Sequence, residues 1–319
     1  MKILEELKEK AKKINGTIIL PEAHIDERVR EAGKIAILEG VADFIVFGKQ
    51  EDYPVEYNNS KCKVIDIATY EKRDEYINLL YELRKAKGMT IEQASELINE
   101  PIYFAMMLLK DNMADGVVAG AKYSTADVLR PALQIIKTKP DKKIVTGNML
   151  MLKEDADPLV FGDVSLIEKP TVEQLAEIAI DNAEFMEKVV GVEPKVAMLS
   201  YSTKGSAKSE MVDLVAEATK IAQSNSDYMI DGEMQVDSAL DIATAKKKGV
   251  TSEVGGNANV LIFPDLNAGN IGYKLVARLG GYTAVGPIML NFNKPVNDLS
   301  RGCTVDEIVN TISITKLMI

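Results

Sequence analysis

Several segments of the chain place Ser, Thr, Gly or Arg directly after an apolar run and before a segment with helical spacing. They are residues 20–28, 119–127, 200–208, 263–270 and 295–303. Unpaired backbone N–H groups and the positive dipole end at a helix start favour an anion. Helix capping also explains each segment singly, because Ser124-x-x-Asp127 and Thr304-x-x-Glu307 fit the capping box. Loops after successive parallel strands converge at one edge of a sheet, so together they predict a site for an anionic ligand.

Other chemistry has little support in the residues. No segment matches the Walker pattern or GxGxxG, and no GxSxG elbow accompanies His24, which is the only histidine. The chain has 1 His and 2 Cys, Cys62 and Cys303, too few for a structural zinc site or an iron–sulfur cluster. Cys303 lies near Arg301, so it is either an activated thiol or a small apolar residue at a helix start.

Composition excludes further classes of function. The 319 residues are 46% hydrophobic and 27% charged, as in ordinary globular proteins. A net charge of −10, no Trp and 6% aromatic residues predict no nucleic-acid partner, and the charge also opposes binding to an anionic membrane. Residues 1–7 carry acidic residues and helical spacing, whereas a signal peptide needs an uninterrupted apolar stretch. No apolar run approaches the roughly 18 residues of a membrane span. These features predict a reduced, cytoplasmic protein without a disulfide framework.

Strand-like and helix-like segments alternate along the chain. Short apolar runs predict strands at 17–20, 43–47, 63–67, 116–119, 143–145, 195–201, 259–263 and 284–289. Apolar residues at three- and four-residue steps predict helices at 26–38, 69–85, 90–98, 126–137, 172–190, 208–222, 239–248 and 271–279. This alternation predicts an α/β protein with mostly parallel sheets.

The alternation of strand-like and helix-like segments is interrupted near Lys139-Pro140 and again near Gly286-Pro287, which suggests domain boundaries at these two points. After the second point only one strand-sized and one helix-sized segment remain, too little to form a core alone. We therefore expect a first α/β domain made of residues 1–140 and 288–319, completed by the C-terminal segment, and a second of residues 141–287.

Four motifs in order resemble the phosphate acetyltransferase (phosphotransacetylase) family. They are STADxLRPALQIIKT at 124–138, STKGSAK at 202–208, FPDLxAGNIGYK at 263–274 and KPVNDLSRGC at 294–303. The resemblance implies two three-layer α/β/α domains of the isocitrate/isopropylmalate dehydrogenase-like type, an active site in the interdomain cleft, and a homodimer. It implies reversible transfer of an acetyl group between acetyl phosphate and coenzyme A, with coenzyme A or acetyl-CoA as a substrate. No tightly bound cofactor and no metal are expected.

The same resemblance implies roles for particular residues. Ser300 stabilises the reacting centre, Arg301 holds phosphate, and the base that takes the thiol proton falls on Glu307. The family usually has Asp there, and Asp306 lies immediately before it, so either carboxylate could be the base. Implied substrate-binding residues are Arg130, Ser124, Thr125, Arg28, Arg84, Lys204, Asn297 and Asp298. For Arg28 and Arg84 an exposed salt bridge is the alternative.

A thiolate is the nucleophile that attacks the acyl carbon, and no activated nucleophile with a histidine partner is evident. We therefore expect direct attack in a ternary complex without a covalent acyl-enzyme. Two departures from the family lie at Tyr123, where many members have His, and at Gly147-Asn148-Met149. The departures at Tyr123 and Glu307 leave open a non-catalytic acetyl-CoA-sensing module, and a phosphate butyryltransferase-like enzyme with a longer acyl group is the other alternative.

Overall fold

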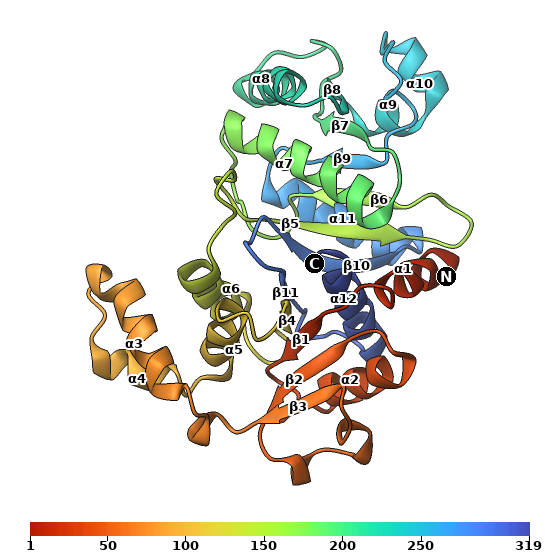
Figure 1. The fold of residues 1–319 in the computed structure, drawn as a ribbon. Helices are drawn as coiled ribbons and strands as arrows, with labels where there is room; N and C mark the ends of the chain where they lie inside the picture. The colour runs from red at the N-terminus through yellow and green to blue at the C-terminus, as the bar shows by residue number, and fades with distance from the viewer. The chain divides into compact units, whose positions relative to one another are not determined.

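The computed structural model describes residues 1–319 and contains two compact units. The first unit comprises residues 2–141 and 292–319, and the second comprises residue 1 with residues 142–291. Each unit is built on one β-sheet, of 5 and 6 strands respectively (Figure 1). The predicted α/β class with two mostly parallel sheets is confirmed.

The sheet of the first unit has the order β11-β4-β1-β2-β3, with every neighbouring pair parallel. Its strands are β1 (Thr17–Leu20), β2 (Asp43–Phe47), β3 (Cys62–Ile65), β4 (Gly116–Ala119) and β11 (Val296–Asp298). Apolar, β-branched side chains let β1, β2 and β4 lie between helical layers, which is why short apolar runs predicted them. The C-terminal strand β11 adds to the edge of β4, with Val296 opposite Val117.

Helices cover this sheet. They are α1 (Lys2–Ala11), α2 (Glu27–Glu39), α3 (Arg73–Arg84), α4 (Ile91–Leu97), α5 (Pro101–Lys110), α6 (Thr125–Pro131) and α12 (Val305–Leu317). One core cluster joins β1 and β2 to the buried faces of α2 and α12, including Val29 and Ile308. Helix α5 was not predicted because its residues 104–109 are all apolar and all buried, so it has no polar face to give a helical period.

The sheet of the second unit has the order β10-β5-β6-β9-β7-β8. Its strands are β5 (Thr146–Leu152), β6 (Leu159–Gly162), β7 (Lys195–Leu199), β8 (Met229–Met234), β9 (Val260–Ile262) and β10 (Thr283–Leu290). Strand β5 is antiparallel to both of its neighbours, and the other pairs are parallel. The helices of this unit are α7 (Val172–Phe185), α8 (Glu210–Asn225), α9 (Val236–Leu240), α10 (Ile242–Lys247) and α11 (Leu266–Gly280).

Some predicted boundaries are wrong. The strand expected at 143–145 begins only at Thr146, because the Lys143 amide donates to Glu177 instead of to a strand neighbour. The helix expected from residue 69 begins at Arg73, after a 3-10 turn that Asp66 caps. The helix expected at 239–248 is two helices, since Asp241 ends α9 and caps α10. Helix α6 passes into a π-helical turn, Ala132–Ile136, after Pro131.

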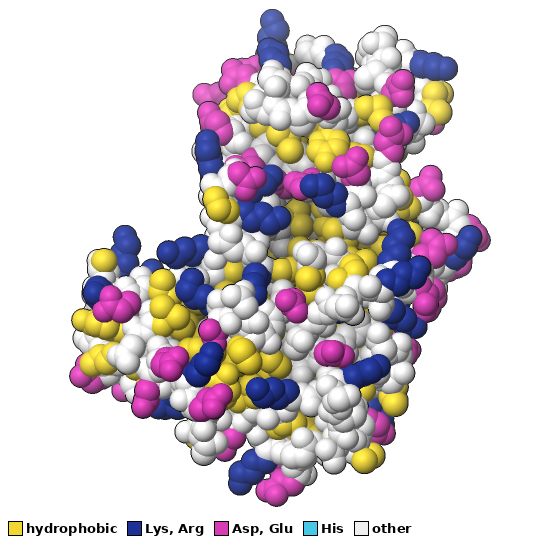
Figure 2. Space-filling view, in the orientation of Figure 1, with side chains coloured by type: hydrophobic (Ala, Val, Ile, Leu, Met, Phe, Trp, Pro, Cys, Tyr) yellow, Lys and Arg dark blue, Asp and Glu magenta, His cyan; other side chains and the backbone are white.

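The surface agrees with the composition. Acidic and basic side chains are interspersed over the face shown in Figure 2, with no broad area of one sign. No helix combines the length and the apolar character that crossing a membrane requires.

Candidate functional site

The segment 299–304 between β11 and α12 carries the two residues expected at the reaction centre. Ser300 and Arg301 are both exposed, and the Ser300 hydroxyl oxygen accepts a hydrogen bond from the Gly302 amide at 3.4 Å. The backbone amides of Ser300 and Arg301 donate to no group of the protein. The segment therefore presents a hydroxyl, a guanidinium and two backbone donors to solvent.

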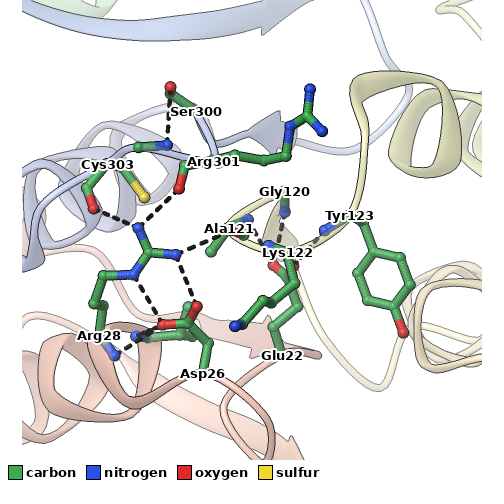
Figure 3. A network of polar contacts seen from close by, with 12 residues as sticks. Glu22, Asp26, Arg28, Gly120, Ala121, Lys122, Tyr123, Ser300, Arg301 and Cys303 are labelled. Atoms are coloured by element: carbon green, nitrogen blue, oxygen red, sulfur yellow. Dashed lines mark hydrogen bonds and ion pairs between the residues drawn. The ribbon is translucent and has the colours of Figure 1, made fainter.

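Arg28, at the start of α2, holds this segment from its carbonyl side. Its Nη1 donates to the carbonyl oxygens of Arg301 and Cys303 at 2.9 and 2.8 Å. Its Nε and Nη2 donate to the two carboxylate oxygens of Asp26 at 3.1 and 2.8 Å, and Nη2 also donates to the Ala121 carbonyl at 3.0 Å. Figure 3 shows these contacts, with the Arg301 guanidinium directed away from them. All five N–H groups of Arg28, which we expected to face a substrate, are therefore bonded to the protein.

Asp26 is the anionic partner in this network. It is also the N-cap of α2, accepting from the amides of Arg28 and Val29. Burial opposes its ionisation, but the Arg28 guanidinium and these amides lower the pKa of its carboxyl below the usual value. Asp26 thus fixes the plane of the Arg28 guanidinium.

Glu22 fills the anion-binding turn after β4. Its carboxylate is fully buried and accepts from the amides of Gly120, Ala121, Lys122 and Tyr123 at 2.7, 3.1, 2.6 and 3.1 Å (Figure 3). Gly120 has φ of +111°, a conformation that side chains rarely adopt, and it passes close to Asp298. The amides that the sequence marked as a candidate anion site are occupied by the protein's own carboxylate.

Both predicted capping boxes are confirmed. Ser124 and Asp127 cap α6, and Thr304 and Glu307 cap α12. The Glu307 Oε2 atom accepts from the Thr304 amide at 2.8 Å, and Asp306 beside it is exposed. Ser124 and Glu307 therefore each have a structural partner, and Glu307 lies in the first turn of the helix that follows Ser300 and Arg301.

A hydrogen bond between Thr125 and Asp298 connects the loop after β4 with the end of β11. The Thr125 hydroxyl donates to Asp298 Oδ2 at 2.6 Å, whereas Asp298 Oδ1 is buried without a partner. Burial raises the pKa of the Asp298 carboxyl to about 6. The neighbouring Asn297 is fully buried, and its amide nitrogen donates to Thr315 of α12 at 2.8 Å.

Arg130 lines a cavity of about 450 Å³ in the first unit. Two tyrosines, Tyr103 and Tyr123, stand beside it together with the carboxylates of Glu100 and Asp127. Burial raises the pKa of the Tyr123 phenol, which therefore stays neutral at physiological pH. This cavity combines aromatic faces with one guanidinium and two carboxylates, so Arg130 is the one group of the lining that can pair with an anion.

Arg84 lines a second cavity, also of about 450 Å³. It lies there with Lys87 and Gln93, and its Nε atom is buried without a partner. Leu97 lines both cavities, so the two are adjacent.

Lys204 belongs to the second unit, where its ammonium group pairs with Asp231 and donates to the Gly232 carbonyl at 2.9 Å. The same loop is held by buried Glu233, which accepts from the Ser202 hydroxyl at 2.9 Å and the Gly205 amide at 2.7 Å. The loop is therefore ordered by carboxylates of its own unit.

The thiol and the imidazole are poor nucleophiles or bases here. Cys303 packs in the core beneath α2 and α12, and burial raises the pKa of its thiol to about 11. Of the two alternatives for Cys303, the structure shows the apolar packing residue. Burial lowers the pKa of His24, whose Nδ1 atom is buried without a partner. No group of three or more His, Cys, Asp or Glu side chains is placed to hold a metal ion.

Sequence reasoning missed Glu22 and Asp26. Both were within a segment chosen for its position after β1, but no role was assigned to either. For Glu22 the available signal was an acidic residue just after a buried strand, where parallel strands end and free amides of neighbouring loops gather, and for Asp26 it was an acidic residue at the N-cap of a helix.

Comparisons with known proteins cover almost the whole chain. The sequence profile of the phosphate acetyl/butaryl transferase family matches residues 2–316. A phosphate acetyltransferase of Clostridium acetobutylicum is 47% identical, over 99% of this chain and 98% of that protein. The crystal structure of a phosphotransacetylase from Streptococcus pyogenes matches with a TM-score of 0.91 at 41% identity, covering 99% of this chain and 97% of that one.

A branched-chain phosphotransacylase from Enterococcus faecalis is more distant. It matches with a TM-score of 0.72 at 18% identity, covering 95% of this chain and 98% of that one. At this identity the likeness concerns the fold alone.

Proposed function

The chain belongs to the phosphate acetyl/butaryl transferase family and is an acyltransferase, and from this premise we propose that it interconverts acetyl phosphate plus coenzyme A with acetyl-CoA plus phosphate. The observation that carries this proposal is the exposed Ser300-Arg301 pair on a turn whose carbonyls are fixed by Arg28. The acetyl group fits better than a branched or longer one, because the relatives at 41–47% identity are named for acetyl transfer and the branched-chain protein is only 18% identical.

In the proposed reaction both substrates are bound before any bond changes. The coenzyme A sulfur, as thiolate, forms a bond to the acetyl carbon, and the bond from that carbon to the phosphate oxygen then breaks. The electron pair leaves with phosphate, whose charge the planar Arg301 guanidinium neutralises. The Ser300 hydroxyl and the nearby free amides stabilise the negative charge that develops on the carbonyl oxygen.

A covalent acyl-enzyme has little support in these residues. The only nucleophilic sulfur near the turn is Cys303, which is buried and has its pKa raised to about 11. Ser300 has no imidazole partner to remove its proton, and nucleophilic serine generally needs one. Direct attack is therefore the mechanism that these groups favour.

We assign the base that takes the thiol proton to Glu307. It lies in the first turn of α12, and one of its oxygens is bonded to the Thr304 amide, which fixes the carboxylate. Asp306 is exposed and has no such anchor. A carboxylate in a fixed position promotes loss of the thiol proton even though it is a weak base.

Coenzyme A is proposed to use the two adjacent cavities. Its anionic groups would meet Arg130 in one cavity and Arg84 with Lys87 in the other, and the tyrosines of the first cavity offer flat apolar faces. A volume of about 450 Å³ is within the usual range for small-molecule sites. Thr125 and Asp298 stay proposed substrate contacts at the junction of the two loops, together with Ser124.

We also propose a homodimer that uses α11. In the single chain only Gly269 of this helix is buried, and Ile271, Leu275 and Leu279 are 57%, 52% and 82% exposed. Steps of four residues place these side chains on one face, an apolar stripe with the exposed Lys274 and Arg278 at its edge. Strand β10 beside it ends the sheet, so the helix stripe and the strand edge offer two self-complementary surfaces for a second copy.

The direct test is an assay of purified protein with acetyl phosphate and coenzyme A. Thioester should form, and acetyl phosphate should react faster than propionyl or butyryl phosphate. Binding of acetyl-CoA without turnover would instead identify a sensing module. Glu307→Gln should reduce kcat far more than Asp306→Asn, and the opposite ranking would move the base to Asp306.

A further inference from the structure

The Arg28 guanidinium lies beside the 300–303 turn but has no N–H group free to bond to a ligand. A guanidinium has five N–H groups. In Arg28 all five donate hydrogen bonds, to the Asp26 carboxylate and to the carbonyls of Ala121, Arg301 and Cys303. A phosphate oxygen could bond to Arg28 only if one of these contacts first broke. Arg28 therefore differs from Arg301, whose guanidinium is exposed and directed away from this network (Figure 3).

The four acceptors of Arg28 come from three separate parts of the chain. Asp26 begins α2, Ala121 lies in the loop after β4, and residues 301 and 303 lie 273 and 275 positions further along the chain. The two carbonyls of the last segment flank Gly302, so bonds to both fix the direction of the backbone through the turn. The backbone direction in turn determines where the Ser300 and Arg301 side chains leave the main chain, and hence where their hydroxyl and guanidinium groups can lie.

We propose that Arg28 is a positioning residue that acts through the 300–303 turn and does not bind a substrate. This inference rests on the proposed function, since it concerns how Ser300 and Arg301 are placed for acetyl transfer. A misplacement of about 1 Å can reduce a rate by about 100-fold, because reacting groups must meet in a near-attack geometry.

A lysine in place of Arg28 keeps the charge but lacks the planar fork. Its ammonium has three donors on one atom, so it cannot reach Asp26, Ala121 and both turn carbonyls together. A merely electrostatic role of Arg28 would survive this change. A positioning role would not.

The experiment compares steady-state kinetics of Arg28→Lys with those of Arg30→Lys. Arg30 is two residues further along α2, and its only hydrogen bond through the side chain is to the Ala23 carbonyl at 3.2 Å. Arg28→Lys should lower kcat about 10- to 100-fold with KM for acetyl phosphate and for coenzyme A changed less than about threefold. Arg30→Lys should leave all three values close to those of the wild type.

Two further variants keep the test decisive if Arg28→Lys folds poorly. Asp26→Asn keeps a capping oxygen for α2 but removes the charge that orients Arg28, and it should lower kcat by a smaller factor in the same direction. In Arg28→Ala, added guanidinium ion should restore part of kcat, whereas added ammonium ion should not.

A tenfold or larger rise of KM for either substrate with unchanged kcat would overturn the proposal and make Arg28 a substrate ligand. Unchanged kcat in Arg28→Lys and in Asp26→Asn would overturn it as well. The wild-type assay separates this failure from that of the proposed function, because a wild type that forms no thioester fails before any variant is compared.

Discussion

Two loops of the first unit, residues 119–125 after β4 and residues 299–304 after β11, lie next to each other but are held in opposite ways. Strands β4 and β11 are neighbours in the sheet, and the Leu299 amide donates to the Ala119 carbonyl at 2.7 Å. The first loop is held by an anion on its N–H groups, since Glu22 accepts from four successive amides. The second is held by a cation on its carbonyl groups, through Arg28.

This difference decides which loop can receive an anionic ligand. Amides that already bond to a buried carboxylate have no donor left for phosphate. The turn that Arg28 fixes through its carbonyls keeps the backbone amides of Ser300 and Arg301 free, together with the Arg301 side chain. Residue composition alone did not separate the loops, because both have Ser, Thr, Gly and a basic residue at a helix start. The partner of each loop, which lies far away in the sequence, makes the distinction.

We expect the largest effect on the free energy of unfolding from Glu22→Gln, which removes the carboxylate that binds the amides of the loop at 119–125. The amide of Gln offers one carbonyl oxygen, and its NH₂ group opposes two of the four backbone donors. We expect a loss of about 4 kcal/mol in the free energy of unfolding, because buried donors are left unpaired. Urea denaturation measures the loss, and Glu27→Gln, an exposed acid of the same region, should stay within about 0.5 kcal/mol of the wild type. A loss below about 1 kcal/mol for Glu22→Gln would mean that the loop does not depend on this carboxylate.

Arg301→Gln tests the second loop. Because the Arg301 side chain is exposed and has no protein partner, stability should be unchanged, but kcat/KM for acetyl phosphate should fall about 100- to 1,000-fold. Kinetics and thermal denaturation measure the two quantities. Lys61→Gln removes the same charge from an exposed site on the unit and serves as the control. If kcat/KM fell equally in both variants, the loss in Arg301→Gln would come from the change in net charge and not from the position of Arg301.

Asp298→Asn sharpens the comparison at the point where the two loops meet. The pKa of Asp298 is raised from 3.8 to about 6 by burial, so the folded state binds a proton more tightly than the unfolded state. The stabilising contribution of this proton is complete below about pH 4 and is lost as the pH rises through about 6.

The Asn variant cannot lose this contribution and still accepts from Thr125. The unfolding free energy of the variant minus that of the wild type should therefore be on the order of 3 kcal/mol larger at about pH 8 than at about pH 4. Denaturation curves at both pH values measure the gain. A constant difference between the two proteins over this range would show that Asp298 does not titrate there.

The smallest effect is expected for Cys303→Ala. The thiol is buried and its pKa is about 11, so it is protonated at neutral pH, and kcat should change less than about threefold. Removing a buried sulfur should reduce stability by about 1 kcal/mol. A loss of kcat by two orders of magnitude in a folded variant would reopen the acyl-enzyme mechanism.

Much of the fold could be predicted from local pattern. The runs at β1, β2 and β4 are short, apolar and β-branched, which is what a strand buried on both faces requires. Strand β5 was predicted too early, at 143–145, because Gly147 and Asn148 interrupt the apolar character of residues 146–152, although all of these residues are buried. Helix α5 was missed for the opposite reason, because it is apolar on every side.

The site was predictable only in part. The family motifs singled out Ser300 and Arg301, which the structure shows on one exposed turn. They also singled out Arg28, but the number of its donors that the protein uses depends on residues 121, 301 and 303, which only the folded chain brings together. The same holds for Glu22, whose four partners lie about 100 positions away.

The position of β11 in the first sheet has a consequence for synthesis on the ribosome. Strand β4 pairs with β1 on one side and with β11 on the other, and β11 is made only after the entire second unit. Until then the nascent chain exposes an open strand edge, which invites pairing with other chains. The 300–303 turn can therefore form only after residues 142–291 of the second unit have been synthesised, and chaperones that shield strand edges should matter most before that point.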